Sequence, residues 1–241
     1  MPPTTENDSL AVLIDADNTS SQYAKAIFEE IVTLGDANVR RIYGDFSGTR
    51  LSGWNKAIQS LAILQHQQRT NTTGKNASDI ALVIDAMDLM YKGRLDGFCL
   101  VSSDSDFTRL AQRLREDGLA VYGFGEKKTP ESFRNACTRF TYLENLLTPS
   151  PEIPVGGAAG SSGGQAKLRP KEAVPVISKA IGDPDEDGWV NLGIIGTRIQ
   201  GAHPDFDPRT YGCSNLIKLV QQSGGFETRR DDSSAFVRRK K

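Results

Sequence analysis

Short apolar runs recur along the first two thirds of the chain. LAVLID (10–15) closes on an acid, and GFCLVSS (97–103) and LAVYGFG (119–125) are similar continuous runs. Runs of this length are typical of parallel strands that are buried on both faces. We therefore expect strands at these positions, with further strands at VRRIYGD (39–45) and near residues 63–66. The run at 119–125 is expected to be the last strand.

Between these runs, apolar residues follow helical spacing. In residues 21–34 they are Ala24, Ile27, Phe28, Ile31 and Val32. The same spacing predicts helices at 54–64, at 79–91 with Ser78 as the cap, at 106–117 and at 130–137. A strand that alternates with a helix five or so times predicts an α/β fold, a three-layer sandwich around a parallel sheet.

Residues 149–167 interrupt this pattern. They are rich in Pro, Gly, Ala and Ser, and such a segment buries too little apolar area to order itself. We expect a first domain at 8–148, a flexible linker at 149–167 and a second domain at 168–241. The second domain has helical patterns at 169–182, 189–200 and 210–225, followed by FETRR and AFVRR around the turn DDSS. Three helices and a β-hairpin predict a small winged-helix domain.

Composition indicates the cellular compartment in which the protein is expected. Its 241 residues are 38% hydrophobic, the start lacks the features of a secretory signal, and no window has the roughly 18 apolar residues of a membrane span. The three cysteines are few, distant and odd in number, so we expect them in the core of a cytoplasmic protein. With two histidines, His66 and His203, a zinc site of the usual kind is not expected.

The two parts of the chain differ in charge. Residues 1–150 hold 16 Lys and Arg against 19 Asp and Glu, a net charge of −3. Residues 167–241 hold 13 against 10, a net charge of +3, and the chain ends on four basic residues. This asymmetry favours a nucleic-acid partner.

Acidic residues gather where the strands are expected to end. They are Asp15 and Asp17 with Asn18 after the first strand, Asp104 and Asp106 after the strand at 97–103, and Asp79 at the start of the helix at 79–91. Ligands of parallel sheets bind beyond the carboxyl ends of the strands, so three segments deliver these acids to one edge of the sheet. We call this group of acids at the sheet edge the acidic rim. Clustered carboxylates repel one another unless cations neutralise them, and hard oxygen ligands suit Mg²⁺ or Mn²⁺. Such ions activate water and neutralise charge on a phosphoryl group.

Each acid alone also fits a structural role. Asp104 or Asp106 fits a helix cap, and Asp79 fits a partner of the helix dipole. The convergence of three segments favours the functional interpretation. Asp88 is expected on a solvated face, and a place near the site stays open for Asp85.

Two other motifs fit less well. DADNT (15–19) has the spacing of the haloacid-dehalogenase phosphatases, but the later lysine and acidic pair of that fold are not matched here. TGKN (73–76) lacks the upstream glycine and the hydroxyl residue of a Walker A loop. Lys75 is either a phosphate contact or a solvated loop lysine.

Three blocks of the first domain resemble the NYN domain, a LabA-like branch of the PIN-like nucleases. They are LAVLIDADN, KNASDIALVIDAMDLM and GFCLVSSDSDFTRLAQRLREDGLAVYGFG, which come in the order and spacing of that family. The resemblance implies Mg²⁺- or Mn²⁺-dependent cleavage of RNA, with Asp15, Asp79, Asp104 and Asp106 as metal-binding positions. It also implies supporting roles for Asn18 and Ser103. Asp17 stands where the family often has Glu, which leaves its direct role open.

The second domain has a resemblance of its own. PDFDPRTYGCSNLIKLVQ is similar to the LOTUS, or OST-HTH, domain. That family implies binding of RNA or docking to an RNA helicase. Basic residues on both strands of the expected hairpin favour contact with phosphate over a merely solvated surface.

Together these features predict an endoribonuclease that acts on single-stranded RNA. The alternative is a non-catalytic RNA-binding or regulatory adaptor that keeps the fold. The intact set of acids argues against the adaptor, because a retired site tends to lose costly clustered charges.

Overall fold

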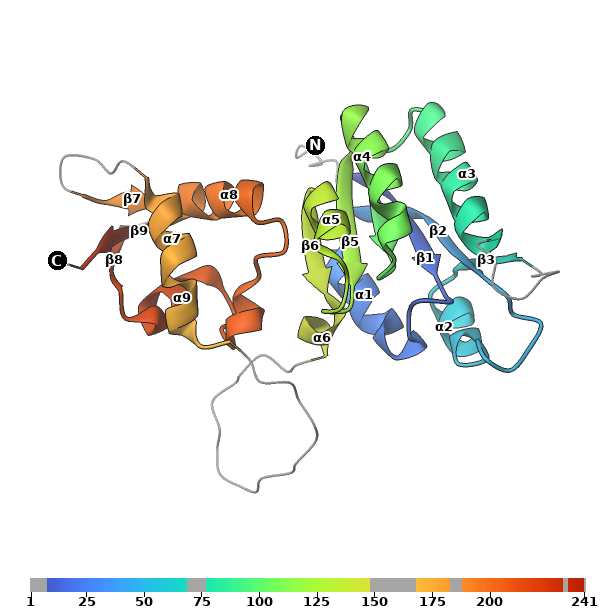
Figure 1. Cartoon of the computed structure of the whole chain (residues 1–241), viewed down its shortest axis with the longest axis horizontal. Coiled ribbons are helices and arrows are strands. Elements are labelled where there is room, and N and C mark those ends of the chain that lie inside the picture. Colours follow the sequence, from blue (N-terminus) through green and yellow to red (C-terminus); the bar gives the residue numbers. More distant parts are fainter. Residues whose placement is uncertain (1–7, 69–76, 148–167, 183–187, 232–233, 241) are drawn as a thin grey trace, which may run out of the picture. The chain divides into compact units, whose positions relative to one another are not determined.

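The computed structural model describes residues 8–68, 77–147, 168–182, 188–231 and 234–240. The chain divides into two compact units, 1–147 and 148–241 (Figure 1). The expected linker at 149–167 and Lys75 lie outside the described residues. In the described ranges, no helix has both the length and the apolar character needed to cross a membrane.

A six-stranded parallel sheet forms the centre of the first unit, in the order β3-β2-β1-β4-β5-β6. Its strands are β1 (Ser9–Asp15), β2 (Asp36–Gly44), β3 (Leu64–Gln67), β4 (Gly97–Val101), β5 (Ala120–Gly125) and β6 (Arg139–Tyr142). All residues of β4, and all but the first of β1, are buried, as their apolar runs predict. The α/β three-layer fold expected from the sequence is confirmed.

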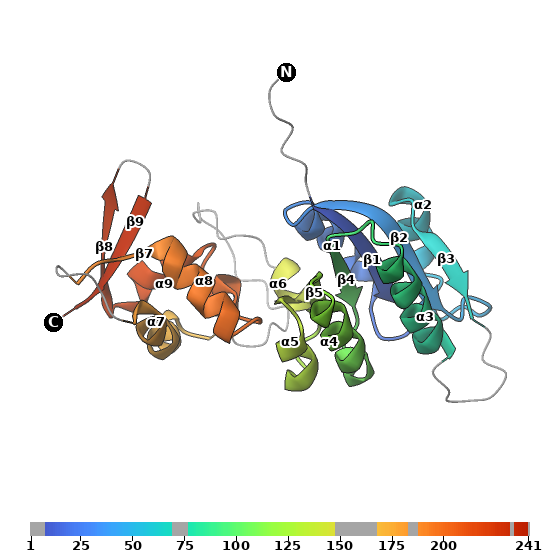
Figure 2. The same ribbon diagram turned by 90° about the horizontal axis from the view of Figure 1, so that it is seen from above.

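Helices cover both faces of this sheet (Figures 1 and 2). One face is covered by α3 (Ala77–Tyr91), α4 (Thr108–Glu116) and α5 (Glu131–Ala136). The other face is covered by α1 (Ala24–Ile31), α2 (Trp54–Ser60) and α6 (Leu143–Leu146). Each face has its own apolar core, and the two cores meet the sheet through alternate residues of β1, such as Leu13 on one face and Ile14 on the other. Short 3₁₀ turns, η1 (Ser21–Tyr23) and η2 (Ser105–Phe107), precede α1 and α4.

Two expectations for this unit are wrong. The strand at 119–125 is not the last, because β6 pairs with it in parallel. Ser78 does not precede the long helix, which already includes Ala77, and the Ser78 hydroxyl bonds to Asp17 instead.

The second unit has the expected winged-helix arrangement. Its elements are η3 (Pro170–Ala173), α7 (Val174–Ile181), β7 (Val190–Asn191), α8 (Leu192–Ala202), η4 (Pro208–Tyr211), α9 (Leu216–Ser223), β8 (Phe226–Asp231) and β9 (Ser234–Arg239). The strands form an antiparallel sheet in the order β7-β9-β8. Asn191 and Asn215 cap α8 and α9 with their side chains, and Gly224, at a φ of 79°, ends α9.

The α-helices of this unit begin later than expected, because 3₁₀ turns precede α7 and α9 and a short strand precedes α8. The pattern at 189–200 predicts a helix from Trp189, but α8 starts at Leu192. Val190 and Asn191 pair with β9 as a third strand. A strand of two residues is too short to show the two-residue period of side chains.

Candidate functional site

The centre of the parallel sheet is where its strand order reverses. β1 and β4 lie side by side, and β2 and β5 extend the sheet in opposite directions from them. The chain continues from β1 to α1 on one face of the sheet and from β4 to α4 on the other, and ligands of such sheets bind beyond the carboxyl ends of the strands at this point. Asp15 is the last residue of β1, and Asp104 comes three residues after β4.

Asp15 is the buried member of the acidic group, with 1% of its surface exposed. Its carboxylate accepts hydrogen bonds from the Ser102 hydroxyl at 2.7 Å and from the Asn18 side-chain amide at 2.8 Å. The backbone N–H groups of Asp17 and Asn18 also donate to it. Burial raises the pKa of Asp15, and the bonds from Ser102 and Asn18 oppose that rise. These four donors fix the orientation of the Asp15 carboxylate.

Asp104 and Asp106 lie in the turn after β4. The backbone N–H of Asp104 donates to the Ser102 hydroxyl at 3.1 Å, and Asp104 Oδ1 accepts from the Asp106 N–H at 2.9 Å. Asp104 therefore caps η2, one of the roles that the sequence left open. Ser102 touches both Asp15 and Asp104, so it ties the ends of β1 and β4 together.

The pKa of Asp79 reflects the other acids of the rim. Asp79 lies in the first turn of α3, where the helix dipole alone would favour its charged form. Its pKa is instead raised from 3.8 to about 6, by burial first and then by repulsion from Asp15, Asp104, Asp17 and Asp106. Acids from two other segments, the end of β1 with the loop after it and the turn after β4, thus act on Asp79 at once.

Asp17 is paired with a basic side chain. Arg50, from the loop between β2 and α2, forms an ion pair with Asp17 Oδ1. The Ser78 hydroxyl donates to Asp17 Oδ2 at 2.9 Å. Since Ser78 precedes Asp79, this bond also ties the start of α3 to the loop after β1. The Arg50 side chain is 64% exposed, so solvent reaches its guanidinium.

The structure places the serines after β4 and the Asp85 carboxylate, whose position the sequence left open. Ser103 accepts a bond from the Glu126 N–H at 2.9 Å, so it supports the loop after β5 and not the acids. Ser102 contacts Asp15, a role that sequence reasoning missed. Asp85 accepts bonds at 2.7 Å from both Arg41 and Tyr43, in a separate polar cluster.

The donor chemistry of the rim suits a hard divalent cation. Its side-chain donors are carboxylate, hydroxyl and amide oxygens, and the raised pKa of Asp79 reflects negative charge that a cation would offset. Among the described residues, no three His, Cys, Asp or Glu side chains are arranged as a complete metal-ligand group. The acids share one electrostatic field without forming such a group.

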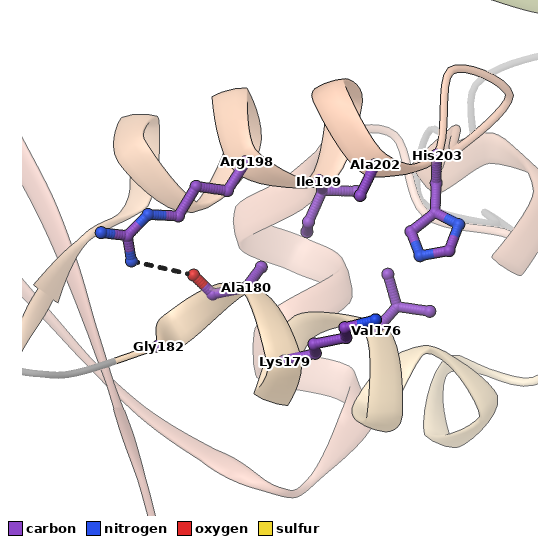
Figure 3. Close-up of a pocket in the computed structure, with 8 residues that line it drawn as sticks. All are labelled: Val176, Lys179, Ala180, Gly182, Arg198, Ile199, Ala202 and His203. Atoms are coloured by element: carbon purple, nitrogen blue, oxygen red, sulfur yellow. Dashed lines mark hydrogen bonds between the residues drawn. The ribbon is translucent and has the colours of Figure 1, made fainter. Parts of the chain in front are cut away.

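A separate hollow of about 410 Å³ lies in the second unit, between α7 and α8 (Figure 3). Val176, Ala180 and Ile199 give it apolar walls. Arg198 donates to the backbone carbonyls of Ala180 and Ile181, so its guanidinium stabilises the end of α7.

Comparisons with known proteins cover both units. The sequence model of the NYN domain matches residues 9–144, and that of the OST-HTH/LOTUS domain matches residues 166–238. No curated protein matches the chain significantly. A solved structure of a protein of unknown function from Vibrio parahaemolyticus is 16% identical with a TM-score of 0.49, over 57% of this chain and 94% of that one. The structure of Acinetobacter baumannii MurG is 10% identical with a TM-score of 0.37, over 89% of this chain and 69% of that one. Neither structural likeness bears on function.

Proposed function

Because the chain belongs to the NYN domain family and carries a C-terminal OST-HTH/LOTUS domain, we propose that it is a divalent-metal-dependent endoribonuclease acting on single-stranded RNA. NYN domains are usually ribonucleases, and LOTUS domains suggest RNA binding. In the proposed reaction, water adds to the phosphorus of a phosphodiester. One phosphorus–oxygen bond to a sugar breaks, and the leaving oxygen takes up a proton.

The observation that carries the proposal is the shared field of the rim acids. Asp79 keeps its proton to about pH 6 because burial and four other carboxylates act on it. Such repulsion destabilises the fold unless a cation offsets it. A site that binds Mg²⁺ or Mn²⁺ needs this excess of negative charge.

Two of the four proposed metal-binding residues are held by hydrogen bonds. Asp15 is fixed by Ser102 and Asn18, and Asp104 by the turn that it caps. Asp79 and the exposed Asp106 complete the proposed set. A bound Mg²⁺ or Mn²⁺ would supply positive charge that stabilises the charge developing on the phosphoryl group. Asn18 and Ser102 would hold the Asp15 carboxylate in place while substrate binds.

Positive side chains near the rim would guide the RNA. Arg50 is paired with Asp17 and largely exposed, so its guanidinium would contact a phosphate that approaches the rim. Lys127 and Lys128 follow β5, whose carboxyl end lies next to that of β4. Because Asp15 is buried, the scissile phosphate would have to reach below the surface of the rim. A flexible single strand can do this more readily than a rigid duplex.

Cleavage of a circular single-stranded RNA tests the proposal. The RNA is incubated with the full chain and Mn²⁺, Mg²⁺ or EDTA, beside Asp104→Asn and the control Asp88→Asn. Asp88 is an exposed acid on α3, so it controls for the loss of one charge. We expect metal-dependent linearisation by the wild type and by Asp88→Asn, and a loss of at least about a hundredfold with Asp104→Asn.

Other outcomes separate the alternatives. Cleavage of linear RNA from its ends, with circular RNA intact, would make the protein an exonuclease. Binding of RNA without cleavage in any metal, equally by wild type and Asp104→Asn, would favour the non-catalytic adaptor.

The cytoplasm is the proposed location, in keeping with three buried free cysteines. Docking of an RNA helicase to the second domain also stays a proposal.

A further inference from the structure

The three-stranded sheet of the second unit has two unlike faces. Side chains alternate between the faces along each strand. Val237 of β9 is fully buried, and its cross-strand neighbours Val190 and Thr228 lie on the same, inner face. The intervening residues Arg229 and Phe236, which are directly opposite each other, therefore lie on the outer face. Figure 2 shows β8 and β9 as a hairpin beside β7.

Four planar groups meet on this outer face. The guanidinium carbon of Arg229 lies 4.9 Å from the ring centre of Trp189 and 5.4 Å from that of Phe236. The guanidinium carbon of Arg238 lies 4.6 Å from the ring centre of Trp189. We call Trp189, Arg229, Phe236 and Arg238 the stacking surface.

The stacking surface is ordered by its surroundings. Glu227, directly across from Arg238, accepts from Arg238 Nε at 3.1 Å and forms an ion pair with the same guanidinium. Gly188, at a φ of 79°, brings the chain so close that a Cβ there would lie 3.3 Å from Arg238 Cδ. A planar group held in place loses little conformational freedom when a ligand stacks on it.

Charge on the hairpin favours a polyanion. In the described residues 226–231 and 234–240, five cations, four Arg and one Lys, outnumber the acids Glu227 and Asp231. Trp189 and Phe236 are half-buried, whereas Arg229 is exposed. Aromatic rings flanked by guanidinium planes within a positive field match the two parts of a single strand of RNA, its flat bases and its phosphates.

We propose that the stacking surface binds single-stranded RNA by stacking on unpaired bases, and not by phosphate contact alone. Aromatic and guanidinium planes accept any base, so binding is tolerant of sequence. A duplex covers the faces of its bases and leaves only the phosphates for contact. The inference deepens the proposed function, because it says how the second domain holds the RNA, but it does not require that the first domain cuts it.

The test compares bases with phosphates, in EDTA so that no cleavage intervenes. The full chain is titrated with a fluorescent single strand of about ten nucleotides and with an abasic strand of the same length and charge. We expect the wild type to bind the abasic strand at least about tenfold more weakly. Equal affinity for the two strands would overturn the proposal without any variant being made.

A double substitution, Arg229→Lys with Arg238→Lys, separates planarity from charge. Lysine keeps the charge but lacks the planar guanidinium. We expect about five- to tenfold weaker binding of the normal strand and unchanged binding of the abasic strand. The matched control is Arg230→Lys with Arg239→Lys, on the inner face, where Arg239 bonds to the Ser178 carbonyl. This control should bind like the wild type.

Two results would overturn the proposal. Normal affinity in the Arg229/Arg238 double variant would show that the surface binds by charge alone, and equal weakening in both double variants would show that the loss is not specific to the stacking surface. A third result would favour a protein partner. It is displacement of both the normal and the abasic strand by an acidic peptide. Thermal melts check that the variants fold, and Trp189→Phe, which keeps an aromatic ring, should retain most of the affinity.

Discussion

Removing the charge of Asp79 should stabilise the metal-free protein at neutral pH. The pKa of Asp79 is raised from 3.8 to about 6, which corresponds to about 3 kcal/mol at 1.36 kcal/mol per pKa unit. Asp79 is partly exposed and lies in the first turn of a helix, so solvent screening and the lost dipole interaction reduce this figure. We expect Asp79→Asn to raise the free energy of unfolding by about 1–2 kcal/mol.

The pH dependence has a definite sign. A raised pKa means that the folded protein binds the Asp79 proton more tightly than the unfolded chain does. The associated stability is fully present below about pH 4 and is lost as the pH rises through about 6. The difference between wild type and Asp79→Asn should therefore be small at about pH 4 and largest above about pH 7.

Urea unfolding in EDTA measures this difference. Trp54 is 2% exposed in the core of the first unit, so its fluorescence reports unfolding of that unit, in a Trp189→Phe background. In buffer without EDTA, Mn²⁺ should stabilise the wild type by about 2.7 kcal/mol at a hundred times the dissociation constant, and should stabilise Asp79→Asn much less. The control Asp88→Asn should change stability by less than about 0.5 kcal/mol. Destabilisation by Asp79→Asn at neutral pH would refute the electrostatic reasoning.

Two further predictions concern the support of the rim. Ser102→Ala removes the 2.7 Å bond to the buried Asp15 carboxylate, so it should cost about 1–3 kcal/mol in urea unfolding and weaken RNA cleavage. Ser103→Ala should leave the rate of cleavage nearly unchanged, and equal rates for the two variants would contradict the assignment. Gly125→Ala should destabilise the first unit by about 2 kcal/mol, because its Cβ would lie 2.7 Å from the Ser102 carbonyl. Gly48→Ala, whose Cβ has nothing within 4 Å, serves as the control, and equal melting temperatures would exclude this close approach.

The sequence predicts the buried strands and the acids at their ends. The buried strands are continuous apolar runs, and in a parallel sheet their carboxyl ends must share an edge. Asp15 and Asp104 follow directly from that rule. β6 escaped because its four residues, RFTY, include an arginine and contain no apolar run.

The sequence does not predict the side-chain contacts within the rim. Ser102 and Ser103 follow a strand that is buried on both faces, so alternation gives no phase to choose between them. Arg50 reaches Asp17 from a loop, and neither residue spacing nor periodicity predicts such a contact. Ser78 fits a cap by its residue type, yet its hydroxyl bonds across 61 positions of the chain to Asp17.

The pairing of β1 with β4 has a consequence for the order of folding. Leu10 lies beside Gly97, so the central pair of the sheet joins segments made far apart in time during synthesis. At about 5–20 residues per second, β4 follows β1 by on the order of ten seconds. Contacts between such distant segments also close slowly, because a long loop must be ordered first. Until then Asp104 cannot lie beside Asp15, so a half-made chain lacks the complete acidic rim on which the proposed cleavage of RNA depends.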